Sequence, residues 1–266
     1  MEHIITDRRS TDGKRPLSFI GIIPARYAST RFPGKPLADL GGMTVIERVY
    51  RQASIELDDV WVATDDSRIF SAVESFGGKV VMTSPDHRSG TDRCREAYDN
   101  IGSDADVIIN IQGDEPFIAP LQLRQIKACF DDAATDIATL VRPFPASGSI
   151  EALENPNSPK VAVGADGRAL MFSRSVIPFI RGIERSQWPS SHQFYTHIGM
   201  YAYRAKALHE ITLLQPSPLE LAESLEQLRW LENGYTIKVG VSDTLTIGID
   251  TPDDLESARI FLQSQS

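Results

Sequence analysis

Basic side chains gather in a loop that directly follows the first apolar segment of the chain, residues 19–25. Between Gly13 and Ala38 there are five basic residues and no acidic one, although the whole chain carries a formal net charge of -9. Guanidinium and ammonium groups offset the charge of a polyphosphate, and short residues such as Ser29 and Gly34 leave backbone N–H groups free to donate to it. The loop therefore predicts a polyphosphate site, with a solvated loop that binds nothing as the alternative.

The loop lacks the two common phosphate-binding motifs. Lys35 is followed by Pro36 instead of serine or threonine, and the glycine that opens a Walker P-loop is absent. No Gly-x-Gly-x-x-Gly follows the apolar segment either. These departures disfavour a P-loop kinase or ATPase and a Rossmann dinucleotide enzyme.

Two aspartates each follow a short apolar segment. Asp114 comes after residues 107–111, and Asp250 comes after residues 246–249. Thr251 fits the N-cap of the next helix, which leaves Asp250 free for another task. Carboxylates opposite a basic phosphate loop are what Mg²⁺ requires when it is held by one or two carboxylates and substrate phosphates. We therefore expect one or two divalent cations here, although Asp114 in a simple surface turn would give the same local pattern.

Apolar runs of strand length, which alternate with segments of helical period, must position these side chains. The continuous runs over 19–25, 60–63, 79–82 and 107–111 predict an α/β fold with a doubly wound, mostly parallel sheet. Ligands bind at the carboxyl ends of the strands in such sheets, where the basic loop and Asp114 both lie. Helix starts are expected at three reciprocal cap patterns: Thr44 with Glu47, Ser217 with Glu220 and Thr251 with Asp254.

Proline spacing divides the chain. We expect a polar tail over 1–17 and one domain over 18–266, made of a nucleotide-binding half (18–141), a proline-rich insertion (142–218) and a return to the core (219–266). The insertion carries a hairpin signal at 161–163 and 170–172 and a strand at 198–203, so it is predicted to be a β-rich subdomain. A single helix is expected from Pro218 to near Gly234, and strands at 237–241 and 246–249 precede a last helix.

Composition narrows the class of protein. The acidic balance of 36 Asp and Glu against 27 Lys and Arg argues against a nucleic-acid partner. No apolar run reaches membrane-spanning length, so no membrane partner is expected. Cys94 and Cys129 stand far apart without a metal-binding or disulfide pattern, which is typical of reduced thiols in a cytoplasmic protein.

Eight segments in chain order closely resemble the CMP-Kdo synthetase (3-deoxy-manno-octulosonate cytidylyltransferase) family. They are IIPARYASTRFPGKPL (22–37), ATDD (63–66), HRSGTDR (87–93), NIQGDEP (110–116), FSR (172–174), HIGMYAYR (197–204), QPSPLE with LEQLR (215–220 and 225–229) and IDTPDDL (249–255). The resemblance implies a fold of nucleotide-diphospho-sugar transferase type, in which the inserted segment 142–218 is a substrate and dimerisation subdomain. It also implies transfer of CMP from CTP to the anomeric hydroxyl of Kdo, in a Mg²⁺-dependent cytoplasmic homodimer that supplies lipopolysaccharide biosynthesis.

The same resemblance implies roles for individual residues. The triphosphate would be held by Arg26, Ser29 and Lys35, and the backbone of Pro24 and Ala25 would lie near the cytosine. Ser89 and Gly90 would face the nucleotide, and Gln112 would bridge nucleotide and sugar. Arg26, Lys35, Asp114 and Asp250 are the expected catalytic residues, and the two aspartates are the expected magnesium ligands. The expected sugar-site residues are His197, Tyr201, Glu226 and Gln227.

The sugar half departs from the family at one position and leaves alternatives open. Leu221 stands where many members have histidine, so an amino-substituted Kdo or another 2-keto sugar acid remains an alternative acceptor. Helical spacing places Glu223, Glu226 and Gln227 on one face, opposite a leucine stripe, which a plain solvated face would also do. Other candidates are a CMP-sialic acid synthetase, a CTP-binding module without turnover and a glycosyltransferase. The last would need Asp-x-Asp where this chain has Gln112-Gly113-Asp114.

Overall fold

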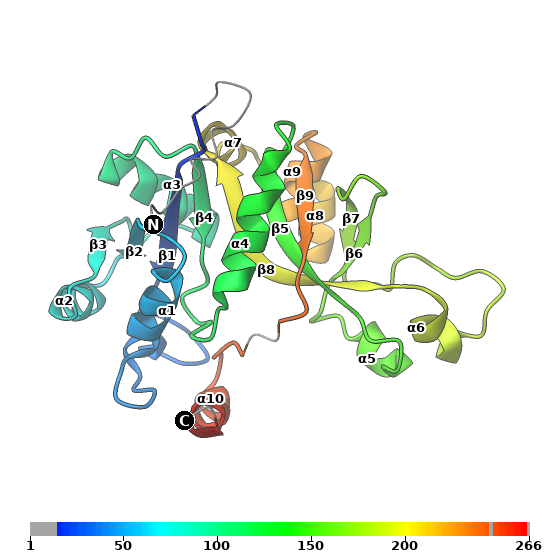
Figure 1. Cartoon of the computed structure of the whole chain (residues 1–266), viewed down its shortest axis with the longest axis horizontal. Coiled ribbons are helices and arrows are strands. Elements are labelled where there is room, and N and C mark those ends of the chain that lie inside the picture. The colour runs from blue at the N-terminus through cyan, green and yellow to red at the C-terminus, as the bar shows by residue number, and fades with distance from the viewer. Residues whose placement is uncertain (1–14, 245–246, 265–266) are drawn as a thin grey trace, which may run out of the picture.

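The computed structural model describes residues 15–244 and 247–264 (Figure 1). The strands are β1 (Phe19–Ala25), β2 (Val60–Thr64), β3 (Lys79–Met82), β4 (Val107–Asn110), β5 (Ile137–Pro143), β6 (Lys160–Val163), β7 (Ala169–Ser173), β8 (Tyr195–Arg204) and β9 (Ile237–Val241). The α-helices are α1 (Val45–Ala53), α2 (Ser67–Ser75), α3 (Gly90–Ile101), α4 (Pro120–Ala128), α5 (Ile150–Glu154), α6 (Trp188–Ser191), α7 (Ala205–Ile211), α8 (Pro218–Glu223), α9 (Glu226–Glu232) and α10 (Pro252–Ser264). No helix in these described ranges is long and apolar enough to cross a membrane.

The central sheet has the order β3-β2-β1-β4-β8-β5-β9. Strands β1 to β4 pair in parallel, as do β5 and β9, whereas β8 runs antiparallel to both of its neighbours. The predicted α/β class with a mostly parallel sheet is therefore confirmed. The segment 142–218 supplies β8 to the middle of this sheet, as well as the β6–β7 hairpin and the arm that carries α5 and α6 (Figure 1).

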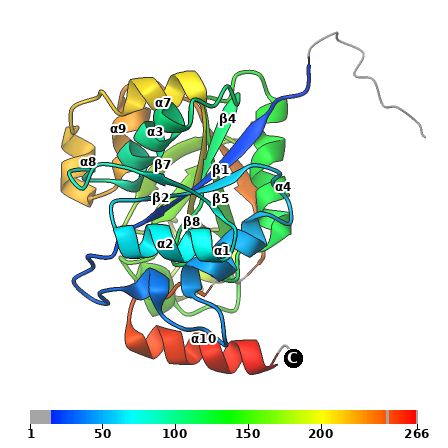
Figure 2. The same ribbon diagram turned by 90° about the vertical axis from the view of Figure 1, so that its left-hand side faces the viewer.

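Helices cover both faces of the sheet (Figure 2). On one face, apolar residues of α3, α7 and α9 pack in a buried cluster with alternate residues of β1 and β4. On the other face, apolar residues of α1, α2 and α4 pack in a second cluster with the intervening strand residues. Burial of both faces explains why the strands appear in the sequence as continuous apolar runs.

The predicted helix starts are present. The Thr44 side chain accepts a hydrogen bond from the backbone of Glu47 at the start of α1. Ser217 and Glu220 form a reciprocal capping box at α8, and the Thr251 and Asp254 side chains bond to each other's backbone N–H groups at α10. The backbone N–H of Asp250 also donates to Asp254, but the Asp250 carboxylate is left out of the helix cap, as the N-cap pattern at Thr251 predicted.

Two sequence predictions in the C-terminal part were wrong. The helix expected from Pro218 to Gly234 is broken into α8 and α9 at Ser224, which has φ 51°. The break also ends the predicted shared face, because Leu221 is 69% exposed while Leu228 is completely buried. The strand expected at 246–249 is absent over residues 247–249, and Thr246 lies outside the described residues. Most of the polar tail expected over 1–17, namely residues 1–14, also lies outside them.

Candidate functional site

A cavity of about 560 Å³ opens at the carboxyl ends of β1 and β4. All ten residues assigned by resemblance to the nucleotide or to the metal line this cavity. The full lining consists of Pro24, Ala25, Arg26, Ala28, Ser29, Arg31, Lys35, Pro36, Arg88, Ser89, Gly90, Arg93, Gln112, Gly113, Asp114 and Asp250. The topology therefore brings the basic loop, the start of α3 and both aspartates to one place.

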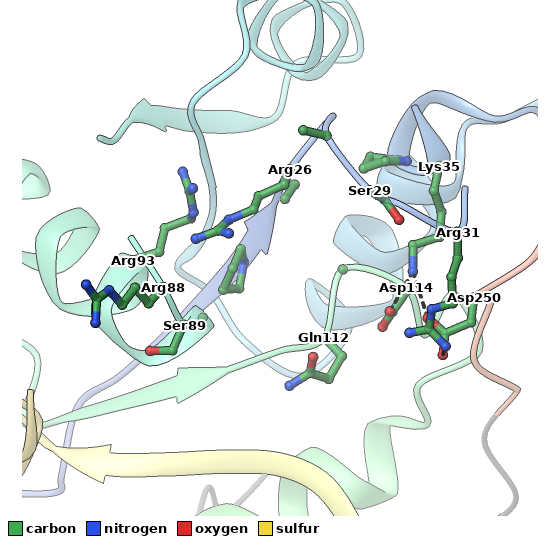
Figure 3. Close-up of a pocket in the computed structure, with 16 residues that line it drawn as sticks. Arg26, Ser29, Arg31, Lys35, Arg88, Ser89, Arg93, Gln112, Asp114 and Asp250 are labelled. Carbon is green, nitrogen blue, oxygen red and sulfur yellow. Dashed lines mark hydrogen bonds and ion pairs between the residues drawn. The ribbon is translucent and has the colours of Figure 1, made fainter. Parts of the chain in front are cut away.

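Cationic groups dominate the cavity wall (Figure 3). Nη2 of Arg26 is buried and has no hydrogen-bond partner, so this guanidinium can still bind a ligand. Arg93 is fully buried and donates to Asp65 and Thr83, which makes it a support for the wall. Sequence reasoning did not single out Arg31, Arg88 or Arg93, because their spacing alone does not separate a lining arginine from a surface one.

The loop after β1 is shaped by a glycine. Gly34 has φ 73° and its N–H donates to the carbonyl of Tyr27 at 2.9 Å. A Cβ at this position would lie 3.0 Å from the Tyr27 ring in a backbone conformation that L-residues rarely adopt. The turn leads directly into a short 3₁₀ helix, Lys35–Leu37, and this directs Lys35 into the cavity.

Both aspartates converge on the Lys35 ammonium (Figure 3). Nζ of Lys35 lies 2.8 Å from Oδ2 of Asp114 and 3.3 Å from Oδ1 of Asp250. Asp250 is brought there by an irregular segment, in which the N–H of Ile249 donates to the carbonyl of Asp114 at 2.9 Å. Arg31 adds a second cation, with Nη1 3.2 Å from the other oxygen of Asp250.

The convergence of the two carboxylates suits a divalent cation. One oxygen from each aspartate already lies within hydrogen-bond distance of a single positive group. Within the described part of the chain, no group of three or more His, Cys, Asp or Glu residues could hold a metal. A cation at this place would therefore take its remaining ligands from phosphates and water, as Mg²⁺ commonly does.

The opposite wall is formed by the N-terminus of α3. Ser89 caps the helix by accepting from the N–H of Asp92, and Gly90 lies against Pro24 without a side chain between them. The positive end of a twelve-residue helix therefore faces the cavity. Below it, Gln112 donates to the carbonyl of Gly199 at 2.8 Å, and a Cβ on Gly113 would lie only 2.7 Å from the Pro24 carbonyl. The turn after β4 can approach β1 this closely because residue 113 is glycine.

The four expected sugar-site residues form a second group, on β8 and α9, and none of them lines the main cavity. Thr91 of α3 connects the two groups, because its hydroxyl donates to Glu226 at 2.8 Å and it stands directly after Ser89 and Gly90. Burial raises the pKa of Glu226, whose other oxygen accepts from Arg229 at 2.9 Å. The second group therefore adjoins the cavity at the start of α3.

This second group is largely shielded from solvent and incompletely paired: Tyr201 and Gln227 are buried, and His197 and Glu226 are partly buried. His197 lies 3.0 Å from the Thr139 hydroxyl, its ring packs against Phe172 and Tyr201, and burial lowers its pKa to about 4. Nε2 of Gln227 and Nε1 of Trp230 are buried without a hydrogen-bond partner. Unpaired buried donors are rare in proteins, so these two favour a polar ligand nearby. Trp230 was missed from the sequence, where it is one apolar residue of an amphipathic helix.

Comparison with known proteins agrees with this geometry. The family model for cytidylyltransferases matches residues 20–238. A 3-deoxy-manno-octulosonate cytidylyltransferase of Phocaeicola vulgatus is 66% identical over 249 residues, which cover 94% of this chain and 99% of the relative. The enzyme of the same name from Porphyromonas gingivalis is 54% identical, over 92% of this chain and 97% of the relative.

Solved structures give the same result. A structure of CMP:2-keto-3-deoxy-manno-octonic acid synthetase complexed with CTP superposes with a TM-score of 0.85 at 40% identity, and covers 94% of this chain and 100% of its own. A cytidylyltransferase from Leptospira borgpetersenii has a TM-score of 0.60 at 14% identity, covers 94% and 88% of the two chains, and supports the fold alone. The chain therefore belongs to the 3-deoxy-manno-octulosonate cytidylyltransferase family.

Proposed function

We propose that the protein transfers CMP from CTP to the anomeric hydroxyl of 3-deoxy-D-manno-octulosonate (Kdo) and releases pyrophosphate. One observation carries this proposal: a single cavity holds the basic loop, the start of α3 and two converging aspartates. That arrangement supplies what a nucleoside triphosphate and a divalent cation need. The names of the full-length relatives then specify the nucleotide and the acceptor.

The nucleotide is proposed to occupy the main cavity. The unpaired Arg26 guanidinium, Ser29 and Lys35 would bind the triphosphate, and the N-terminus of α3 at Ser89 and Gly90 would add backbone donors. Pro24 and Ala25, the last residues of β1, would lie beside the cytosine. These cationic groups are already in position before the reaction, so they can stabilise the negative charge that develops on the leaving pyrophosphate.

We further propose Mg²⁺ as the cofactor, held by Asp114 and Asp250 with phosphate oxygens. When bound, the ion would supply charge neutralisation at the phosphates and a lower pKa for the attacking hydroxyl. The protein groups do the positioning: the aspartates hold their oxygens together, and Lys35 lies where it can move from them to the triphosphate. The anomeric oxygen then attacks the α-phosphorus in line with the bond to the β-phosphate, without a covalent enzyme intermediate.

The acceptor is proposed to bind between β8 and α9. His197 is neutral at physiological pH, and together with Tyr201, Glu226 and Gln227 it offers donors and acceptors for the hydroxyls and the carboxylate of the sugar acid. Gln112, fixed by its bond to Gly199, would lie between the two substrates. Leu221, at which the chain departs from the family, lies on α8 and is 69% exposed, whereas Gln227 of α9 is 5% exposed. The names of the relatives favour Kdo over an amino-substituted acceptor.

We include a homodimer and the cytoplasm in the proposal. Segment 142–218 exposes large apolar side chains, with Phe179 of the arm 72% exposed and Leu170 of β7 65% exposed, and such surface is typical of a subunit contact. Cys94 and Cys129 are both free and buried, which suits a reducing compartment. There the product would enter lipopolysaccharide biosynthesis.

The test is pyrophosphate release from a mixture of the protein, CTP, Mg²⁺ and Kdo, with the sugar nucleotide identified by mass spectrometry. We expect CMP-Kdo with CTP and negligible product when N-acetylneuraminate replaces Kdo. Equal turnover of both acids would refute the acceptor and leave the cytidylyltransferase activity standing. Binding of CTP without any release of pyrophosphate would refute the enzyme activity itself.

A further inference from the structure

The junction between α8 and α9 has an unusual backbone. Ser224 has φ 51°, and it is the one residue other than glycine with positive φ in the described ranges. This left-handed conformation costs a residue with a Cβ about 1 kcal/mol or more, so surrounding contacts must maintain it. The turn determines where α9 begins, and Glu226 and Gln227 are the first two residues of that helix.

Arg174, which directly follows β7, holds this turn through backbone carbonyls. Its Nε donates to the carbonyl of Glu223 at 2.6 Å, and its Nη2 donates to the carbonyl of Ser224 at 3.2 Å. Carbonyls at the end of a helix have no partner within the helix, so these bonds satisfy the end of α8. Nη1 donates to the carbonyl of Pro156 at 2.8 Å, which ties the same guanidinium to the loop before β6.

Glu223 is held by its side chain as well. One carboxylate oxygen accepts from the Ser173 hydroxyl at 2.6 Å, and the other accepts from the N–H of Arg174 at 2.7 Å. Lys160 of β6 is completely buried nearby, and the attraction of Glu223 partly opposes the lowering of the Lys160 pKa by burial. Ser173 at the end of the β6–β7 hairpin and Arg174 directly after it thus bind Glu223, the last residue of α8, through both its backbone carbonyl and its carboxylate.

The turn sets the orientation of the acceptor residues. If the chain continued as one helix, each residue after Glu223 would advance by the regular helical rotation, at 3.6 residues per turn. The left-handed residue interrupts that progression. With it, Glu226 reaches the hydroxyl of Thr91 at 2.8 Å, and Gln227 is 5% exposed with a free donor.

We propose that Arg174 and Glu223 are positioning residues for the sugar acceptor. They maintain the Ser224 turn, and the turn presents Glu226 and Gln227 to the acceptor without Arg174 or Glu223 touching it. This inference rests on the proposed function, in which α9 forms one side of the acceptor site. It assigns to the hairpin of segment 142–218 an indirect part in acceptor recognition, through the position of α9.

The test compares the steady-state kinetics of Arg174→Met with those of the wild-type protein, by pyrophosphate release with CTP and Kdo varied separately. We expect the KM for Kdo to rise roughly 10-fold or more, and the KM for CTP to change less than about 2-fold. Arg204→Met is the matched control. Arg204 also donates to a backbone carbonyl, that of Thr135 at 2.8 Å, which belongs to neither α8 nor α9, so its removal should leave both KM values unchanged.

Two further variants separate positioning from a general loss of stability. Glycine adopts positive φ at little cost, so Ser224→Gly in the Arg174→Met background should return the KM for Kdo at least about 3-fold toward the wild-type value. Glu223→Gln keeps the shape but removes one acceptor interaction and its charge, and should raise the KM for Kdo about 3-fold or more. This variant carries the test if Arg174→Met does not fold.

The outcomes distinguish the inference from the proposed function. If the wild-type protein produces no CMP-Kdo, the proposed function is wrong. If the wild-type protein is active but the variants raise both KM values alike, or raise neither, the positioning role is wrong. An Arg204→Met variant that reproduces the Kdo effect would also overturn it, because general destabilisation would then be the cause.

Discussion

Lys35 occupies the place between Asp114 and Asp250 that a divalent cation would take, so the two cations must compete in the nucleotide-free protein. The ammonium lies 2.8 Å and 3.3 Å from one oxygen of each aspartate, and its side chain is only 13% exposed. Replacement by methionine removes the charge and keeps most of the side-chain volume. We therefore expect Lys35→Met to bind Mn²⁺, used as a probe for Mg²⁺, more tightly than the wild-type protein when no CTP is present.

The magnitude follows from the two contacts that the metal must displace. Hydrogen bonds to charged groups contribute about 1.5–3 kcal/mol each when well shielded. The Asp114 and Asp250 side chains are 31% and 48% exposed, so solvent screening reduces each contact to roughly 1 kcal/mol. Together they amount to roughly 2 kcal/mol, which corresponds to about a 30-fold change in the dissociation constant at 1.4 kcal/mol per tenfold.

The assay measures free Mn²⁺ by electron paramagnetic resonance during titration of nucleotide-free protein. Arg31→Met is the control, since Arg31 contacts only Asp250 among these groups and its side chain is 66% exposed; its replacement should change the affinity less than about 3-fold. An affinity in Lys35→Met that is equal to or weaker than that of the wild type would refute the competition. The same variant should bind CTP less tightly and CMP almost normally, because Lys35 is proposed to act on the distal phosphates.

Three more outcomes are expected. Asp114→Asn and Asp250→Asn should each lose at least roughly 100-fold in turnover, and near wild-type rates for both across a magnesium titration would remove the two-carboxylate assignment. Glu226→Ala and Gln227→Ala should raise the KM for Kdo roughly 10-fold at constant KM for CTP, whereas unchanged acceptor kinetics in both would place the sugar elsewhere. Burial lowers the pKa of His197 from 6.5 to about 4. As the pH falls, the imidazole of His197 is therefore protonated in the unfolded chain before it is protonated in the folded protein. The free energy of unfolding should therefore fall as the pH drops from about 6.5 to about 4, by at most roughly 3 kcal/mol. In His197→Gln, the free energy of unfolding measured by urea denaturation should not show this fall. An identical pH dependence in the variant and the wild type would show that His197 is not the cause.

Local patterns in the sequence were sufficient to predict the elements around the main cavity. A strand that is buried on both faces must be continuously apolar, which is why β1 and β4 were predicted. Threonine is a favoured N-cap residue, so the cap pattern at Thr251 also indicated that the Asp250 side chain was free. Since parallel strands bring their carboxyl ends to one edge, the loop after β1 and the turn after β4 were expected to meet.

The proposed acceptor site depends on contacts between residues far apart in the chain. Nothing in the segment 218–234 signals a break, because serine is neither glycine nor proline; the break depends on a guanidinium that lies 50 residues earlier than Ser224. The irregular approach of Asp250 likewise depends on a backbone bond between Ile249 and Asp114.

The sequence by itself therefore determined which residues could carry charge to the carboxyl edge of the sheet, because helix caps and strand runs are set by neighbours along the chain. Only the tertiary structure decided that Lys35 lies between two carboxylates 79 and 215 residues away, and that Arg174 turns α9 toward Thr91. Such contacts depend on the packing of the whole sheet and its helices, so they cannot be predicted from the spacing of residues along the chain.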